Sequence, residues 1–249
     1  MLLRNSASAR KKACAFFVEG ARLCYDAALS DVDILQFFFT SDAKEKFSAY
    51  FDLVLSKSAE AFEISEDISR KLSDTQSPQG MFCVCKTVDK IAKADKINSK
   101  GKYILLENVQ DPSNLGAVSR TAEALGVDGL IVSGGCDIYN PKALRASMGA
   151  FFRLNVIVCD DLQSFIAQAK ALSMTVAAST PSADAQNITQ LDFSGGVICI
   201  VGNEGNGVSE ETMKNASVKV TIPMGGRAES LNAATAAAII IWEMMRRGG

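Results

Sequence analysis

The chain has 249 residues, is 48% hydrophobic and carries a formal net charge of −2. This length allows one large domain or two modest ones with a substantial core. No apolar run reaches the roughly 18 residues of a membrane span. The first residues, MLLRNSASARKK, lack the long apolar segment of a signal peptide. We therefore expect no membrane association and a short frayed arm at the start.

The cysteine and histidine content restricts the chemistry further. Seven cysteines, an odd number in mostly apolar contexts, are typical of reduced thiols in a cytoplasmic protein. Cys83 and Cys85 have no second pair at zinc-finger spacing, so we expect no metal site. The chain contains no histidine, which excludes Ser-His-Asp and Cys-His nucleophiles and any histidine general base.

The first third of the chain mixes strand and helix patterns. FFVEG, DILQFFFT and the end of SPQGMFCVCK are strand-like, and helix-like runs separate them. A lysine-rich stretch follows, with six lysines and two aspartates in residues 86–102. We predict a small α/β domain over residues 1–86 and a linker over residues 87–101. The linker's lysines are either a solvated charge run or a phosphate-facing patch.

Residues 102–249 alternate between short apolar runs and helical segments. The predicted strands are YILLE, GLIVS, NVIVC, MTVAAS, VICIVG and VKVTIP. Such near-continuous apolar strands between helices indicate a parallel sheet covered on both faces. Ligands of these sheets bind beyond the carboxyl ends of the strands, so the loops there are the candidate site.

Two of these loops carry glycine beside polar residues. In NVQDPSNLGAVSR, residues 108–120, Asn114 is a predicted helix N-cap, and Arg120 lies one turn after Gly116 on the same helix face. The alternative is a surface arginine on an ordinary helix. In GNEGNGVSEE, residues 202–211, three glycines allow a ligand to approach the backbone. The spacing is not the dinucleotide fingerprint, which disfavours a nucleotide-dependent dehydrogenase.

The third loop opens the stretch IPMGGRAESLNAATAAAIIIWEMM, residues 222–245. Its composition predicts a helix from Ala228 onward, buried on most of its surface. Ser230 and Asn232 then fall in the first turn, where they either cap the helix or bind a ligand. Three polar, glycine-containing loops at one sheet edge fit an adenosine-type ligand held largely by backbone groups.

NLGAVSR, IVGNEGNGVSEE and IPMGGRAESLNAATAAAI resemble, in order and spacing, the three motifs of the SpoU (TrmH) family of SPOUT RNA 2′-O-ribose methyltransferases. FFVEGARLCYDAA and SPQGMFCVCK resemble the start and close of that family's L30e-like substrate-binding domain. The resemblance implies an α/β catalytic domain with a deep trefoil knot over residues 102–249. It also implies S-adenosylmethionine as cofactor, a homodimer, and methylation of a ribose 2′-hydroxyl in structured RNA, ribosomal rather than transfer RNA.

The resemblance also assigns roles to individual residues. The implied cofactor contacts are Gly202, Ile222, Leu231, Met224 and Thr180. The implied catalytic residues are Arg120, Asn114, Glu204, Ser230 and Asn232. Arg145 and Arg22 are implied to face RNA, although Arg22 stands where many relatives have histidine.

Arginine is effectively always protonated, which leaves two hypotheses for the implied activator, Arg120. Either an unusual site deprotonates it, or it binds phosphate and stabilises the alkoxide while phosphate, water or Glu204 accepts the proton. Two further alternatives stay open for the whole protein. One is an RNA-binding protein without catalysis, and the other is a methylase of the same family that confers antibiotic resistance.

Overall fold

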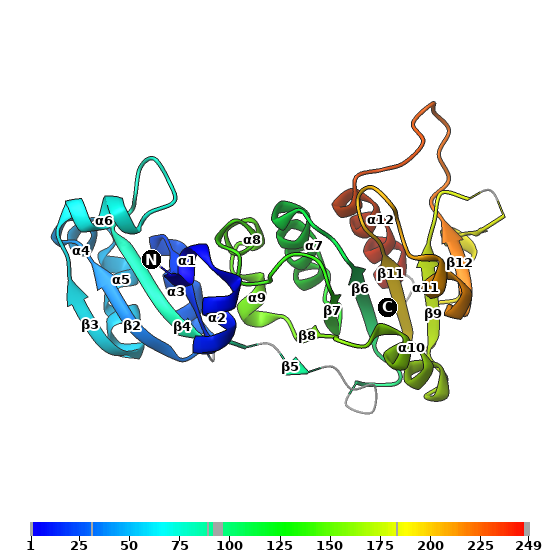
Figure 1. Cartoon of the computed structure of the whole chain (residues 1–249), viewed down its shortest axis with the longest axis horizontal. Helices are drawn as coiled ribbons and strands as arrows, with labels where there is room; N and C mark the ends of the chain where they lie inside the picture. Colours follow the sequence, from blue (N-terminus) through cyan, green and yellow to red (C-terminus); the bar gives the residue numbers. More distant parts are fainter. Residues whose placement is uncertain (1, 31, 89, 92–96, 183, 247–249) are drawn as a thin grey trace. The chain divides into compact units, whose positions relative to one another are not determined.

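The computed structural model describes residues 2–30, 32–88, 90–91, 97–182 and 184–246. They divide into two compact units, residues 1–88 with 137–153, and residues 89–136 with 154–249. Each unit contains its own sheet (Figure 1). Of the predicted linker, residue 89 and residues 92–96 lie outside the described part, including Lys93 and Lys96.

The first unit is built on a four-stranded mixed sheet of order β1-β4-β2-β3. Its strands are β1 (Ala15–Glu19), β2 (Ile34–Phe39), β3 (Ser58–Glu63) and β4 (Met81–Lys86). Helices α3 (Ala21–Leu29), α4 (Ser41–Lys46), α5 (Ser48–Lys57) and α6 (Glu66–Leu72) connect them. The core is aromatic: Phe51 of α5 packs edge-on against Phe39 with ring centroids 4.8 Å apart. The predicted small α/β fold of this region is present.

The start of the chain is not a frayed arm, and that expectation was wrong. It forms helices α1 (Leu2–Asn5) and α2 (Ala7–Ala13). Arg10 is only 4% exposed and pairs with Asp137 at 2.5 Å. Arg4 donates to the carbonyl oxygens of Leu72 and Ser73 at 2.9 and 2.6 Å. Two arginines therefore fix a segment whose composition suggested only a solvated arm.

Residues 137–153 also pack within the first unit, although the predicted domain 102–249 includes them. They contain helices α8 (Pro141–Ser147) and α9 (Ala150–Arg153). The ring of Tyr139 stacks on Phe16 of β1 with centroids 4.4 Å apart. The Tyr139 hydroxyl accepts a hydrogen bond from the backbone N–H of Val88 at 2.6 Å.

The second unit is built on a parallel sheet of order β10-β12-β9-β11-β6-β7-β8-β5 among the described residues. The strands are β5 (Lys90–Ile91), β6 (Lys102–Glu107), β7 (Gly129–Ser133), β8 (Val156–Val158), β9 (Thr175–Ser179), β10 (Gln186–Asn187), β11 (Val197–Val201) and β12 (Val218–Thr221). Every strand predicted from an apolar run is present. The predicted α/β class with a parallel sheet is confirmed.

Helices cover both faces of this sheet (Figure 1). Helices α7 (Pro112–Ala124) and α12 (Ala233–Arg246) pack together, and α12 also contacts β6, β11 and the short 3₁₀ helix at Ile188–Gln190. Helix α10 (Leu162–Ala171) packs with α11 (Glu210–Asn215) and β9. Leu105 of β6 and Ile131 of β7, paired in register, share a buried cluster with Phe165 of α10. No helix in the described ranges is both long and apolar enough to span a membrane.

Helix α12 starts later than predicted, at Ala233 instead of Ala228. The side-chain oxygen of Asn232 accepts hydrogen bonds from the N–H groups of Ala234 and Thr235, at 2.9 and 3.2 Å, and so ends the loop. The helix is also less buried than predicted, because Trp242 is 57% exposed.

Helix α7, in contrast, begins earlier than predicted, before Asn114, its predicted N-cap. Asp111 is the N-cap, and its carboxylate accepts from the N–H of Ser113 at 2.9 Å. Pro112 occupies the first helical position, where its missing N–H costs nothing. Asn114 is therefore not the cap. It lies inside the helix, 7% exposed, so its side-chain amide can bind partners outside the helix.

Candidate active site

A pocket of about 270 Å³ lies at the carboxyl ends of β9, β11 and β12 in the second unit. The rest of its wall is formed by loop 202–208, loop 222–232 and the start of α12. All five residues predicted to contact a cofactor line it, as do two of the predicted catalytic residues. These lining residues are Thr180, Gly202, Ile222, Met224 and Leu231, with Glu204 and Ser230. The pocket therefore lies at the carboxyl edge of the sheet, where the sequence pattern predicts a site.

Loop 202–208 is folded tightly on itself. Asn203 and Gly207 exchange two backbone hydrogen bonds of 3.0 and 2.9 Å. The Asn203 side-chain oxygen also accepts from the N–H groups of Gly205 and Asn206, at 2.9 and 3.1 Å. A Cβ atom on Gly202 would lie 2.1 Å from the carbonyl carbon of Gly207. Glycine is therefore required at 202 so that the loop can close over it.

The carboxylate of Glu204 is held at the start of α7. One oxygen accepts from the side-chain amide of Asn114 at 2.9 Å and the N–H of Asp111 at 3.0 Å. The other oxygen accepts from the N–H of Gln110 at 3.0 Å. Partial burial acts to raise the pKa of Glu204, but these hydrogen bonds outweigh it and lower the pKa below its ordinary value. Glu204 is an anion near a helix N-terminus, a favourable place for negative charge.

Asn114 joins Glu204 to Asn232. Its side-chain oxygen accepts from the side-chain nitrogen of Asn232 at 3.0 Å, while its own nitrogen donates to Glu204. Residues separated by up to 118 positions in sequence thus form one hydrogen-bonded row across the three loops. The side chain of Asn232 caps α12 and takes part in this row at the same time, so the capping interpretation describes a contact of the structure, and ligand binding by Asn232 stays a prediction.

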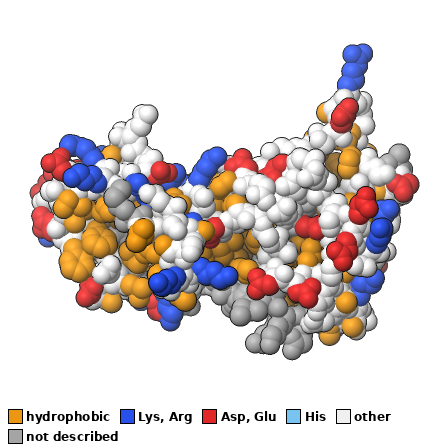
Figure 2. All heavy atoms as spheres, viewed as in Figure 1, with side chains coloured by type: hydrophobic (Ala, Val, Ile, Leu, Met, Phe, Trp, Pro, Cys, Tyr) orange, Lys and Arg blue, Asp and Glu red, His pale blue; other side chains and the backbone are white. Residues whose placement is uncertain are grey.

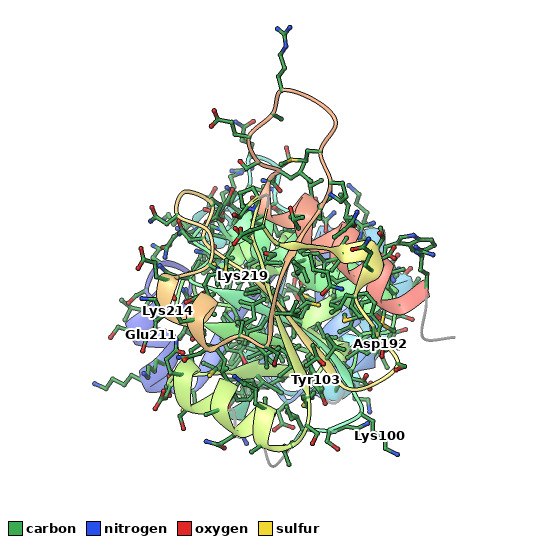
Figure 3. The ribbon with its side chains drawn as sticks, turned by 90° about the vertical axis from the view of Figure 1, so that its right-hand side faces the viewer. Lys100, Tyr103, Asp192, Glu211, Lys214 and Lys219 are labelled. Carbon is green, nitrogen blue, oxygen red and sulfur yellow. The ribbon has the colours of Figure 1, made fainter. Side chains whose placement is uncertain are left out.

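Ser230 and Arg120 do not belong to this hydrogen-bonded row. Ser230 lines the pocket from loop 222–232, which projects from the unit (Figures 1 and 3). No side-chain hydrogen bond joins Ser230 to another residue of the described ranges, so it does not cap α12. Arg120 is exposed on α7, two turns or less from Asn114, and within the described part of the chain it forms no ion pair or hydrogen bond. Its guanidinium is free to meet an anion.

The two arginines predicted to face RNA lie in the first unit. Arg145 of α8 binds Asp74 at 2.7 Å and lies 3.7 Å from Glu19, the last residue of β1. Arg22 of α3, with a side chain 63% exposed, pairs with Asp26 at 3.0 Å. The hydrogen bond and charge of Asp26 raise the pKa of Arg22 above its ordinary value. Charged side chains of both signs are interspersed over the face seen in Figure 2, and Arg145 is already paired with carboxylates.

Sequence reasoning missed three residues, Asn108, Gln110 and Asn203, whose hydrogen bonds order these loops. Asn203 donates from its side-chain nitrogen to the carbonyl oxygen of Asn108 at 2.9 Å. Gln110 donates to the side-chain oxygen of Asn108 at 2.7 Å. Asn108 itself has φ +54°, a left-handed conformation that asparagine tolerates. Asparagine at such loop positions is the local signal that could have marked this turn.

This geometry defines the class of protein: an α/β protein with a ligand pocket at the carboxyl edge of a parallel sheet. Sequence comparison then identifies the family. Residues 101–242 match the SpoU rRNA Methylase family, and residues 3–83 match the MRM3-like substrate binding domain. The chain belongs to the SpoU rRNA methylase family.

Individual relatives agree with this assignment. The chain is 32% identical over 238 residues to the 23S rRNA (guanosine(2553)-2′-O)-methyltransferase RlmP of Bacillus subtilis, covering 94% of this chain and 90% of the relative. The crystal structure of an rRNA methyltransferase from Sinorhizobium meliloti with bound AdoMet superposes with a TM-score of 0.86 at 26% identity, covering 99% and 92% of the two chains. The fold also matches AviRb of Streptomyces viridochromogenes, with a TM-score of 0.88 at 24% identity over 99% and 95%.

Proposed function

We propose that this protein is an S-adenosylmethionine-dependent methyltransferase that methylates a ribose 2′-hydroxyl in ribosomal RNA. The observation that carries the proposal is the pocket at the ends of β9, β11 and β12, lined by all five predicted cofactor residues. The polar row of Glu204, Asn114 and Asn232 is built from the same loops. The rRNA methyltransferases to which the chain is similar favour ribosomal over transfer RNA as substrate.

The residues of the pocket fit an adenosine-type cofactor. Ile188, Ile222, Leu231 and Ile240 give it apolar walls suited to a purine. Gly202 leaves room for the backbone of the loop above it, and a Cβ there would remove that room. When bound, S-adenosylmethionine supplies a methyl group on a positively charged sulfur, from which an oxygen nucleophile can take it.

Methyl transfer forms a bond between the ribose 2′-oxygen and the methyl carbon, breaks the sulfur–carbon bond, and releases the hydroxyl proton. We assign Arg120 to the RNA phosphate beside the target ribose and to the developing alkoxide, because its guanidinium is exposed and its planar set of donors suits a phosphate. Glu204 is a weak base, because its pKa is lowered and both oxygens already accept hydrogen bonds. It positions the start of α7, and water or an RNA phosphate accepts the proton.

Alignment is the second contribution of these residues. Asn114 and Asn232 hold α7 and α12 together beside the pocket, and Ser230 presents its hydroxyl from the pocket wall. We assign Ser230 and Asn232 to contacts with the cofactor or the target ribose. Holding the two reactants in line accounts for several kcal/mol of barrier lowering in comparable reactions.

The assembly and location belong to the same proposal. Trp242 and Ile239, 57% and 37% exposed, leave apolar surface on α12 that supports a homodimer. The deep trefoil knot that the family resemblance implies for residues 102–249 stays part of the proposal. Five of the seven cysteines are buried, and this usage supports the cytoplasm as the protein's compartment. We keep residues 1–86 as the RNA-binding domain and residues 102–249 as the catalytic domain. The proposed RNA contacts are Arg22 in the first range and Arg145 in segment 137–153, which packs within the first unit.

The proposal is tested by calorimetric titration of the purified protein with S-adenosylmethionine, with NAD as the control ligand. We expect micromolar binding of S-adenosylmethionine and none of NAD. Binding of neither, by a protein that melts cooperatively, would favour an RNA-binding protein without catalysis. Binding of NAD would favour a dehydrogenase and contradict the proposal directly.

A further inference from the structure

A second carboxylate near the pocket, and a buried one, has no role in the mechanism above. Glu107, the last residue of β6, is 9% exposed. One oxygen accepts a hydrogen bond from the hydroxyl of Thr212 at 3.0 Å, and the other accepts from the N–H of Ser209 at 3.1 Å. Thr212 is completely buried. A carboxylate shielded in this way is retained only because both oxygens are satisfied.

Glu107 and Glu204 form a reciprocal arrangement between neighbouring strands. Strands β6 and β11 pair in parallel, so their carboxyl ends lie side by side. Glu107 at the end of β6 binds the start of α11, the helix that follows β11. Glu204 in the loop after β11 binds the start of α7, the helix that follows β6. Each strand end therefore fixes the beginning of the other strand's helix.

This arrangement determines the position of loop 202–208. The loop starts where β11 ends, and Ser209 follows its last residue as the N-cap of α11. Glu204 restrains the middle of the loop, and Glu107 restrains the far end through Ser209. The two ends of the loop are already in close contact, because a Cβ on Gly202 would lie 2.2 Å from the nitrogen of Val208. A small shift of Ser209 therefore moves the pocket wall.

We infer that Glu107 is a positioning residue for cofactor binding, acting through Ser209 and Thr212 on loop 202–208. This inference rests on the proposed function, since S-adenosylmethionine is the ligand assigned to the pocket. Glu107 touches no pocket surface itself. Its effect is to keep the glycine loop in the conformation that closes over Gly202.

The test compares Glu107→Gln with Glu243→Gln. Glutamine keeps one acceptor for the fixed N–H of Ser209, so its NH₂ group faces Thr212, and the buried hydroxyl proton of Thr212 loses its acceptor. Glu243 is a matched control: it is also a buried carboxylate of the second unit, 6% exposed, but it pairs with Arg246 and does not line the pocket. Thr212→Val removes the hydroxyl donor and keeps the side-chain shape.

We expect Glu107→Gln and Thr212→Val to weaken S-adenosylmethionine binding about tenfold in calorimetry, which corresponds to about 1.4 kcal/mol. Glu243→Gln should lower the melting temperature and leave the Kd unchanged. Unchanged affinity in Glu107→Gln, or an equal loss in Glu243→Gln, would overturn the inference.

Hydrogen exchange of the ligand-free protein separates this inference from the proposed function. The amides of Gly205, Asn206 and Gly207 are hydrogen-bonded to Asn203, so they report directly on the loop. Faster exchange there in Glu107→Gln, but not in Glu243→Gln, supports the positioning role even where the wild type binds no S-adenosylmethionine. Unchanged exchange at these amides would refute it.

Discussion

Replacing Gly202 by alanine tests the cofactor loop with the smallest possible change. The added Cβ would lie 2.1 Å from the carbonyl carbon of Gly207 and 2.2 Å from the nitrogen of Val208. Both are backbone atoms, so the loop must recede by about 1.3 Å to reach ordinary contact at 3.4 Å. A displacement of this size moves the pocket wall relative to β9 and β12. We expect S-adenosylmethionine binding to weaken at least tenfold, about 1.4 kcal/mol or more.

The assay is calorimetric titration of Gly202→Ala beside Gly195→Ala. Gly195 is a matched control because a Cβ there meets no atom within 4 Å, and it does not line the pocket. We expect Gly195→Ala to bind like the wild type. Wild-type affinity in Gly202→Ala, with both variants folded, would refute the reasoning that this loop must close over residue 202 to form the cofactor site.

Variants of four other residues test the same contacts. Asn232→Ala removes the cap of α12 and the bond to Asn114, so urea denaturation should show a loss of about 1 kcal/mol; an unchanged midpoint would contradict this. Arg120→Lys keeps the positive charge but loses the paired N–H donors of the guanidinium, so kcat should fall roughly tenfold to hundredfold with an unchanged Kd for S-adenosylmethionine. Near-normal turnover would exclude the phosphate-binding role. Asp74→Asn releases one carboxylate from Arg145, so an rRNA fragment should bind more tightly in fluorescence anisotropy, and weaker binding would count against Arg145 as an RNA contact. Hydrogen bonds lower the folded-state pKa of Glu204, so its stabilising effect is present above the unfolded-state value of about 4.3 and disappears as the pH falls through the folded value. Melting curves of Glu204→Gln should therefore depend less on pH in that acidic window than those of the wild type.

The sheet of the second unit could be predicted because its strands are buried on both faces. Residues of β11, Val197–Val201, are all buried, and such a strand appears in the sequence as an uninterrupted apolar run. The parallel arrangement then follows from the helices between the runs. The edge that holds the site follows in turn, because parallel strands end on one side.

The start of α12 could not be predicted because local and tertiary preferences disagree. Residues 228–232 contain good helix formers and no proline or glycine, so propensity favours a helix there. The side-chain bond from Asn232 to Asn114, 118 positions away, fixes where the helix begins instead. The same limit applies to Glu107 and Glu204, whose partners lie on the neighbouring strand's loop and leave no trace in local sequence.

The first unit shows a similar limit. The stacking of Tyr139 on Phe16 and the pairing of Arg10 with Asp137 join segments more than 120 positions apart. Neither contact has a periodic pattern that a sequence can display. The sequence therefore groups segment 137–153 with the domain around it and predicts a frayed arm for the opening residues.

The most direct test of the central claim is methyl transfer to RNA. Purified protein would be incubated with radiolabelled S-adenosylmethionine and ribosomal RNA from cells lacking the gene, and the RNA would then be hydrolysed with alkali. A methyl group on a 2′-oxygen blocks cleavage of the adjacent phosphodiester, so we expect label in an alkali-resistant dinucleotide, and we expect that label to be lost in Arg120→Ala. Label in mononucleotides only, which marks methylation of a base, or no transfer by a protein that binds S-adenosylmethionine, would contradict it.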